Sequence, residues 1–361
     1  MYTNKVISAI SILLALSTSI LNVEAQLKGK YPPVDKPPPF DATWTALVDQ
    51  SKLIKAPLRV PGQCNPVDTY CVWSCTNCLR AESDVQYCPD KKDWALTYDD
   101  GPSANSLTVL DALDARGIKA TFFVIGSRVY ENPQILKKIV DSGHQIGSHT
   151  WSHTPLTSQS TEQIIAEVKW TEQAIKEAVG LTPKWFRPPQ GDFDDRVRGI
   201  LTQLGYKIAI WDLDTFDWHS MSDPTYDLAW IPGNFSVWVQ NTTSTVGHIS
   251  LEHDLYDKTA SKAAEAMDIV MKAKFNLQSL SVCLGDEQPY VEQVTLPKSN
   301  PVGGQEGNGK SPKGNNGKTP AEKPPAEKPP VISANGSNSI KNDALLSIVY
   351  GLMMMLGIIY I

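Results

Sequence analysis

Short apolar runs alternate with amphipathic segments through the middle of the chain. The runs are rich in β-branched and aromatic residues, which favours buried β-strands. Strands are predicted over 94–98, 119–125, 144–148, 184–187, 206–212, 244–252 and, on a weaker pattern, 279–283.

Helices are predicted between these strands from apolar spacing and from capping residues. They run from about Ser106 to Arg116 before Gly117, from Pro133 after the cap Asn132 to Gly143, from the capping box Ser160-x-x-Gln163 to Gly180, over about 194–204, and over about 259–275. Alternating strands and helices over about 200 residues indicate a parallel sheet. With this many units we expect an α/β barrel, whose chemistry belongs at the C-terminal ends of the strands.

The segments on either side of this block differ from it in composition. Residues 26–60 contain proline-rich stretches and are expected to form an extended arm, and residues 61–90 form a cysteine-rich cap. Residues 297–335 are rich in Gly, Lys and Pro and repeat Ala-Glu-Lys-Pro-Pro, which predicts a stalk too polar to pack. The expected catalytic domain therefore spans 91–296.

Both ends of the chain have targeting patterns. Residues 1–25 combine Lys5, an apolar run and a small-x-small cleavage pattern, which is typical of a secretory signal; the run is short for a membrane anchor. Residues 344–361 are apolar and follow a polar spacer and a small-residue cluster. This pattern predicts GPI attachment at Asn335 and removal of 336–361, with a plain tail anchor as the alternative. We expect a mature protein outside the cell, tethered by lipid.

Charge and cysteine content are consistent with an extracellular protein. The net charge of −6 argues against a nucleic-acid partner. Cys75-Thr76-Asn77-Cys78 resembles half of a zinc knuckle, but no second pair matches it, and three disulfides are predicted instead. The sequence leaves their connectivity open, although Cys283 must pair with the N-terminal cluster if all six cysteines are bonded. Predicted glycosylation sites are Asn234 and Asn241.

Polar clusters follow the predicted strands. Asp99 and Asp100 end the first strand, and because side chains alternate along a strand, one carboxylate can bind a cation while the other moves a proton. An ordinary turn is the alternative. His149 and His153 are spaced to meet on one face of a helical turn, although a pair of surface histidines would look the same. Together with Asp100, they would form a two-His, one-carboxylate metal site with open positions.

The later strands are followed by three more clusters. Arg187-Pro188-Pro189-Gln190-Gly191-Asp192 predicts a rigid loop that presents a guanidinium and a backbone N–H, or else an ordinary rigid turn. Asp214-Thr215-Phe216-Asp217-Trp218 pairs two carboxylates with aromatic rings, which favours a partly buried pocket over an acidic surface turn. His253 follows at the end of a late strand.

The succession TYDDGP, HTWSH, RPPQG, DTFDW and LEH closely resembles the five ordered motifs of the NodB-like polysaccharide deacetylases, carbohydrate esterase family 4. With the secretory signal, cysteine-rich cap, stalk and GPI pattern, the chain looks like the chitin deacetylases of fungal walls. The resemblance implies an irregular (β/α)7-type barrel with a small N-terminal disulfide-rich cap.

The resemblance also implies a role for each matching position. It implies one divalent metal, usually zinc and sometimes cobalt, with three ligands: Asp100, His149 and His153. It implies that Asp99 is the catalytic base, oriented by Arg187, and that His253 is the general acid, partnered by Asp217.

The substrate contacts follow in the same way. The backbone N–H of Gln190 matches the oxyanion donor, and Trp218 and Leu251 match the walls of the acetate pocket. Gln190 stands where Tyr is frequent in the family, so contacts of this side chain with substrate stay open. Tyr98 replaces a commoner Phe, which is a harmless change.

The implied function is hydrolysis of N-acetyl groups on chitin, giving chitosan and acetate, by a monomer in the cell wall. One alternative changes the substrate to acetyl-xylan or peptidoglycan. Another is a wall-binding protein that keeps the fold without the reaction. That last hypothesis predicts a gap in the metal triad or in the acid–base pair, and the sequence has none.

Overall fold

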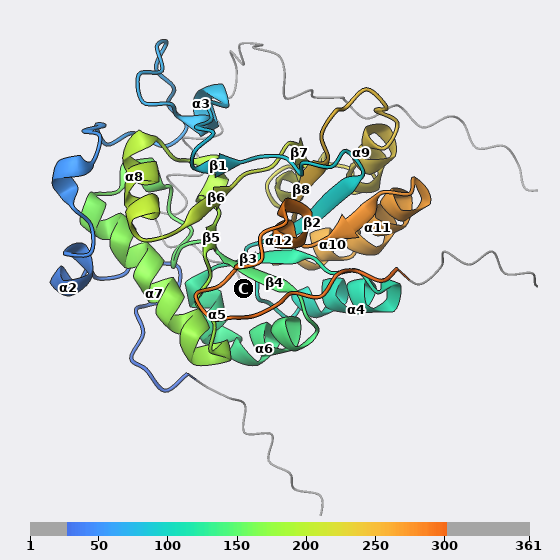
Figure 1. The fold of residues 1–361 in the computed structure, drawn as a ribbon, viewed down its shortest axis with the longest axis horizontal. Helices are drawn as coiled ribbons and strands as arrows, with labels where there is room; N and C mark the ends of the chain where they lie inside the picture. The colour runs from blue at the N-terminus through green and yellow to red at the C-terminus, as the bar shows by residue number, and fades with distance from the viewer. Residues whose placement is uncertain (1–26, 302–361) are drawn as a thin grey trace, which may run out of the picture.

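The structure is a computed structural model that describes residues 27–301 (Figure 1). The predicted signal peptide, the GPI pattern with Asn335, and most of the predicted stalk lie outside the described residues. Within residues 27–301, no helix has the length and apolar character needed to cross a membrane.

A parallel sheet forms the centre of the molecule. Among the described residues it has nine strands in the order β1-β6-β5-β4-β3-β2-β8-β7, and β9 also pairs with β2. All of the pairings are parallel, as the alternating pattern predicted. The strands are β1 (Asp84–Val85), β2 (Asp93–Asp99), β3 (Thr121–Val124), β4 (Gln145–Ser148), β5 (Trp185–Phe186), β6 (Lys207–Ala209), β7 (Leu213–Asp214), β8 (His248–His253) and β9 (Asn276–Gln278).

The chain itself joins the two ends of this curled sheet. β6 pairs with β1 and β5, whereas β7 pairs with β8, and only residues 210–212 separate β6 from β7. Ile210 N donates to Val85 O (2.8 Å), and Asp212 N donates to Ile249 O (3.2 Å). The predicted strand 206–212 is therefore shorter in the structure: residues 207–209 form β6, and residues 210–212 cross from the β1 end of the sheet to the β8 end. The irregular α/β barrel expected from the sequence is confirmed.

Helices surround the sheet in Figure 1. The longer ones are α4 (Ser106–Arg116), α5 (Gly126–Glu131), α6 (Pro133–Asp141), α7 (Thr161–Val179), α8 (Asp195–Gln203), α9 (Trp230–Trp238) and α11 (Ala263–Lys272), and the shorter ones are α2 (Ala42–Thr45), α3 (Trp73–Thr76), α10 (Asp257–Ala260) and α12 (Leu280–Leu284). Short 3-10 turns are η1 (Gln50–Lys52), η2 (Leu156–Ser158), η3 (Pro189–Gly191) and η4 (Asp217–Met221).

Helix boundaries follow the predicted caps closely. The Ser160 side chain accepts a hydrogen bond from Gln163 N (3.2 Å), and α7 ends at Gly180 in the left-handed conformation (φ +75°). Only half of the capping box forms, because the Gln163 side chain donates to Pro38 O of the N-terminal arm instead.

Two predictions about the C-terminal part were wrong. Residues 279–283 form helix α12 rather than a strand, and the strand β9 lies just upstream. The first N–H groups of α12 donate to side-chain oxygens of Thr121 and Gln145, at 2.8 Å each, which supplies the partners that a helix start lacks. Residues 259–275 form two helices, α10 and α11, instead of one. The sequence patterns also missed α5 and α9.

The alternation of side chains along β2 separates packing from chemistry. Trp94, Leu96 and Tyr98 belong to the hydrophobic cluster that includes residues of α4, α6 and α11. Thr97 and Asp99 point the other way, where both contact the Arg187 side chain. This period of two places Asp99 inside the barrel, at the C-terminal end of its strand.

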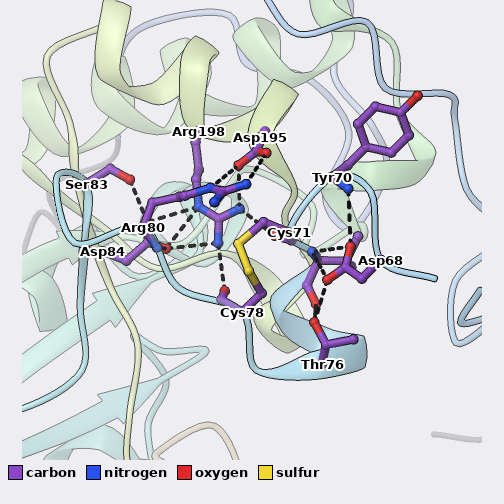
Figure 2. Close-up of a disulfide and its surroundings, with 11 residues drawn as sticks. Asp68, Tyr70, Cys71, Thr76, Cys78, Arg80, Ser83, Asp84, Asp195 and Arg198 are labelled. Carbon is purple, nitrogen blue, oxygen red and sulfur yellow. Dashed lines mark hydrogen bonds and ion pairs between the residues drawn. A yellow bond between two sulfur atoms is a disulfide. The ribbon is translucent and has the colours of Figure 1, made fainter. Parts of the chain in front are cut away.

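Three disulfides join the N-terminal cap to itself and to the barrel. The pairs are Cys64–Cys75, Cys71–Cys78 and Cys88–Cys283. No cysteine is free, so the prediction that Cys283 pairs with the N-terminal cluster is confirmed. Figure 2 shows Arg198 of α8 beside the second disulfide, where it donates to the carbonyl oxygens of Cys71 and Cys78 and pairs with Asp84.

Candidate active site

An arginine–carboxylate pair lies buried at the C-terminal ends of β2 and β5. Arg187 Nη1 donates to Asp99 Oδ1 (2.8 Å) and to Thr97 Oγ1 (2.7 Å). The guanidinium also lies over the Phe123 ring, 4.2 Å from its centroid. Burial lowers the pKa of Arg187, and the Asp99 carboxylate opposes that effect. The pair fixes the orientation of Asp99 and leaves its second oxygen facing His149.

Next to this pair, Asp100, His149 and His153 present ligand atoms that all lie within 4.8 Å of one another. Asp100 Oδ1 is 3.5 Å from His149 Nε2 and 3.3 Å from His153 Nε2. Burial disfavours the charged carboxyl, but the three histidines His153, His149 and His253 outweigh it and lower the pKa of Asp100.

The donor set fits a divalent cation. His149 Nδ1 lies 2.7 Å from the carbonyl oxygen of Arg187 and must donate to it, so that in the neutral imidazole Nε2 is a lone-pair acceptor. Asp100 Oδ1 is also an acceptor, and it is buried without a hydrogen-bond partner in the described chain. Two acceptor atoms that face each other with no proton between them are the arrangement a cation stabilises. The residues expected as metal ligands are therefore brought together.

The spacing of His149 and His153 predicted a helical turn, and this prediction was wrong. Residues 149–153 form a loop in which Thr150 (φ +68°) and His153 (φ +60°) both adopt the left-handed conformation. The loop is held by the buried Glu167 of α7, which accepts hydrogen bonds from Trp151 N and Ser152 N, both at 2.9 Å. Burial raises the pKa of Glu167 to about 7.

On the other side of Asp99, His253 forms a second polar pair with Asp217. Asp217 accepts from His253 Nδ1 (2.6 Å) and from His253 N (2.8 Å), so both carboxylate oxygens are used. Burial disfavours the imidazolium, but Asp217, followed by Asp100 and Asp99, raises the pKa of His253 to about 10. Asp99 and His253 are register partners on β2 and β8, so the two pairs lie on neighbouring strands.

Two of the remaining predicted residues, Gln190 and Trp218, lie in short 3-10 turns, and the third, Leu251, lies on β8. Gln190 follows β5 in a left-handed conformation (φ +58°). Trp218 adjoins Asp217, and 46% of its side chain is exposed. Leu251 is buried and lies two residues before His253, so both side chains share one face of β8.

Three buried carboxylates that hold these loops were missed from the sequence. Glu167 holds the histidine loop, and Asp192 accepts from Thr157 N (2.9 Å) beside Gln190. Asp254 accepts from Gly101 N (2.9 Å), and a Cβ on Gly101 would lie 2.6 Å from its oxygens. Asp192 and Asp254 adjoin recognised motifs, which was the available signal, whereas Glu167 lies in an ordinary amphipathic helix.

The two predicted glycosylation sites have different surroundings. Asn241 is exposed after α9, and its side-chain oxygen accepts from Thr243 N (3.1 Å). Asn234 lies within α9, half-buried, and its amide donates to Thr215 O (3.3 Å). Both stay predictions.

Comparison with known proteins gives consistent matches. Residues 86–209 match the family model described as polysaccharide deacetylase. The chain is 37% identical to chitin deacetylase 1 of Cryptococcus neoformans var. grubii over 298 residues, which cover 76% of this chain and 63% of that protein. It is 34% identical to chitin deacetylase 1 of Saccharomyces cerevisiae, with 64% of this chain and 73% of that protein covered.

Among solved structures, the chitin deacetylase from the fungal pathogen Colletotrichum lindemuthianum is similar, with a TM-score of 0.54 and 28% identity. The similarity covers 59% of this chain and 96% of that one.

Proposed function

Because the chain belongs to the polysaccharide deacetylase family, we propose that it hydrolyses the N-acetyl groups of chitin, releasing acetate and leaving chitosan. One observation carries the proposal: the Asp99–Arg187 pair and the His253–Asp217 pair lie on neighbouring strands, next to the three potential metal ligands. This set contains a base, an acid and a cation site without a gap. The substrate assignment rests on the relatives that are named chitin deacetylases.

Asp100, His149 and His153 would hold the metal, for which we propose zinc, with cobalt as a substitute. When bound, the ion would supply Lewis-acid polarisation of the acetyl carbonyl and acidify the attacking water. Three protein ligands would leave open positions on the ion for water and substrate.

The chain's own residues then divide the proton transfers. Asp99, oriented by Arg187, takes a proton from the attacking water while the water oxygen bonds to the acetyl carbon. The N–H of Gln190 donates to the oxyanion that forms on the carbonyl oxygen. His253 gives a proton to the sugar nitrogen as the carbon–nitrogen bond breaks, because an unprotonated amine leaves poorly. Asp217 keeps His253 charged until that step.

The methyl group of the acetyl unit needs an apolar contact beside these polar groups. Leu251 is buried on the His253 face of β8, and the half-exposed Trp218 follows Asp217 directly. We propose that these two side chains form the walls of the acetate pocket and that the exposed face of Trp218 is open to the polysaccharide.

The proposed location is the cell wall, on the outer side of the plasma membrane. The disulfides fit an oxidising compartment, and the sequence patterns at both ends fit secretion and a GPI tether. Phosphatidylinositol-specific phospholipase C is expected to release the protein from membranes. Mature surface protein that still ends at Ile361 would contradict the tether.

Acetate release from a chitin pentamer, compared with acetylated xylan and peptidoglycan fragments, tests the substrate. Chitin oligomers are expected to give the highest kcat/KM. The His253→Ala variant should lose turnover on every substrate and serves as the blank. A higher kcat/KM on acetylated xylan or peptidoglycan would move the proposal to that polysaccharide, and no acetate from any of them would overturn it.

A further inference from the structure

The loop that presents the Gln190 N–H has an unfavourable backbone. Gln190 (φ +58°) adopts the left-handed conformation, which a residue with a side chain rarely does, and Gly191 (φ +61°), a glycine, follows in the same conformation at little cost. Such conformations persist only where the surrounding structure fixes them. The direction of the Gln190 N–H therefore depends on what packs against residues 188–193.

A tryptophan from the N-terminal cap lies directly on this loop. A Cβ built on Gly191 would be 2.2 Å from the Trp73 ring, so the indole lies against the Gly191 Cα. Trp73 is buried, with 8% of the residue exposed, and its ring meets Trp211 edge-on, with centroids 4.8 Å apart. Trp73 N also donates to Phe193 O (3.2 Å). Both the ring and the backbone of Trp73 thus contact the loop around Gln190.

The next residue of the cap makes a polar contact with the same loop. Ser74 Oγ donates to Asp192 Oδ1 (3.2 Å). Thr157 also donates to this carboxylate, through its N–H and its hydroxyl. Asp192 is therefore fixed between the cap and the segment that follows the histidine loop.

Trp73 itself is held by covalent and ionic links. It begins α3, a helix of four residues that would not be stable alone. Cys71–Cys78 encloses α3, and Cys64–Cys75 joins it to the preceding segment. Arg198 donates to the carbonyls of Cys71 and Cys78, which fastens this disulfide to α8 (Figure 2). We call residues 64–78 the disulfide loop.

We propose that the disulfide loop positions the oxyanion donor: Trp73 presses on Gly191 and so keeps the N–H of Gln190 directed at the reacting carbonyl. The inference rests on the proposed deacetylase function. Trp73 is a positioning residue, because it acts through Gly191 and needs no contact with substrate. It predicts that a change in the cap slows turnover without loss of the metal.

The test compares Trp73→Ala and Trp73→Phe with Trp44→Ala in the full chain. Trp44 serves as the control, because it is another N-terminal tryptophan and packs edge-on against Trp170 of α7, with ring centroids 5.2 Å apart. Three quantities are measured: bound metal, kcat and KM for chitin oligomers, and hydrogen–deuterium exchange of the peptide that covers 188–193. Trp73→Leu replaces Trp73→Ala if the latter does not accumulate as folded protein.

Trp73→Ala should keep its metal and its KM while kcat falls about 10- to 100-fold, the effect of a misplaced group. Hydrogen–deuterium exchange in residues 188–193 should become faster in Trp73→Ala. Trp73→Phe should recover most of the kcat and most of the protection from exchange, and Trp44→Ala should match the wild type in both. Unchanged kcat and exchange in a folded Trp73 variant would overturn the inference, and so would loss of metal together with kcat.

Failure of the proposed function would look different. A wild-type protein that releases no acetate refutes the deacetylase proposal, and the kcat comparison is then void. The exchange measurement still decides whether Trp73 holds the loop: faster exchange in Trp73→Ala supports that contact, and unchanged exchange refutes it.

Discussion

Removing the carboxylate of Asp217 tests how the proposed acid works. Asp217→Asn keeps the size of the side chain but removes its negative charge. Burial lowers the pKa of His253, and the Asp217 charge is the largest of the effects that oppose burial and raise this pKa to about 10. Without that charge, burial dominates, and the pKa of His253 should fall to about 6.5 or below. A cation bound at Asp100 offsets the smaller contribution of Asp100 but leaves that of Asp217.

The expected pH dependence follows from the sign of this shift. A raised pKa means that wild-type His253 is protonated throughout pH 6–8 and loses its proton only as pH rises toward about 10. At a pKa of about 6.5, the variant imidazole is about 3% protonated at pH 8 and about 75% at pH 6. The ratio of variant to wild-type kcat/KM should therefore rise by about 25-fold between pH 8 and pH 6. Taking the ratio cancels pH effects that both proteins share.

Acetate release from chitin oligomers across this range is the assay, and the chain offers a matched control. Asp212 accepts from His248 Nδ1 (2.6 Å) at the opposite end of β8, as Asp217 does from His253 Nδ1, although its backbone donor is the next residue, Ile249 N (2.7 Å). Asp212→Asn should leave the ratio flat. A flat ratio for Asp217→Asn would show that Asp217 does not act by keeping His253 protonated.

Three further predictions separate the roles of other residues. Asp99→Asn should retain metal while turnover falls about 10²- to 10⁴-fold. Asp100→Asn should bind metal more weakly and recover part of its activity in excess zinc. If Asp99→Asn loses metal and Asp100→Asn keeps it, the two roles are reversed. Glu167→Gln should weaken metal affinity about 10- to 100-fold by loosening the histidine loop, and equal affinity in a zinc titration would exclude this support. Replacing Cys88 and Cys283 by Ala removes a disulfide between residues 195 positions apart and should lower the free energy of unfolding by about 2–5 kcal/mol, measured by denaturant unfolding. An unchanged midpoint of the denaturant unfolding curve would contradict this prediction.

The barrel was predictable because its signals are local. Apolar runs such as 94–98 read as buried strands, and parallel pairing placed the polar clusters at one edge of the sheet. In the pairs Asp99–Arg187 and Asp217–His253, a residue at the end of a strand contacts a residue that lies far away in the sequence.

What the sequence could not predict depends on tertiary contacts. The apolar–polar alternation of residues 279–283 suits a strand, but side chains from β3 and β4 receive the N–H groups of a helix there. The spacing of His149 and His153 suggested a helical turn, whereas a loop held by Glu167 brings the rings together. Glu167 lies on α7, and no local pattern distinguishes a buried carboxylate from a solvent-facing one.

The position of the cap was also beyond sequence analysis. Five clustered cysteines predicted a covalently closed segment, but not which surface it covers. The contact between Trp73 and Gly191 joins residues more than a hundred positions apart, and only the folded structure shows it.

The central claim is a metal-dependent deacetylase built on Asp100, His149 and His153, and a metal titration tests it most directly. The purified protein is freed of metal by chelation, and acetate release from a chitin pentamer is measured as zinc is added back. We expect no acetate from the metal-free protein and full recovery at about one zinc per chain. Full acetate release from thoroughly metal-free protein would contradict the account.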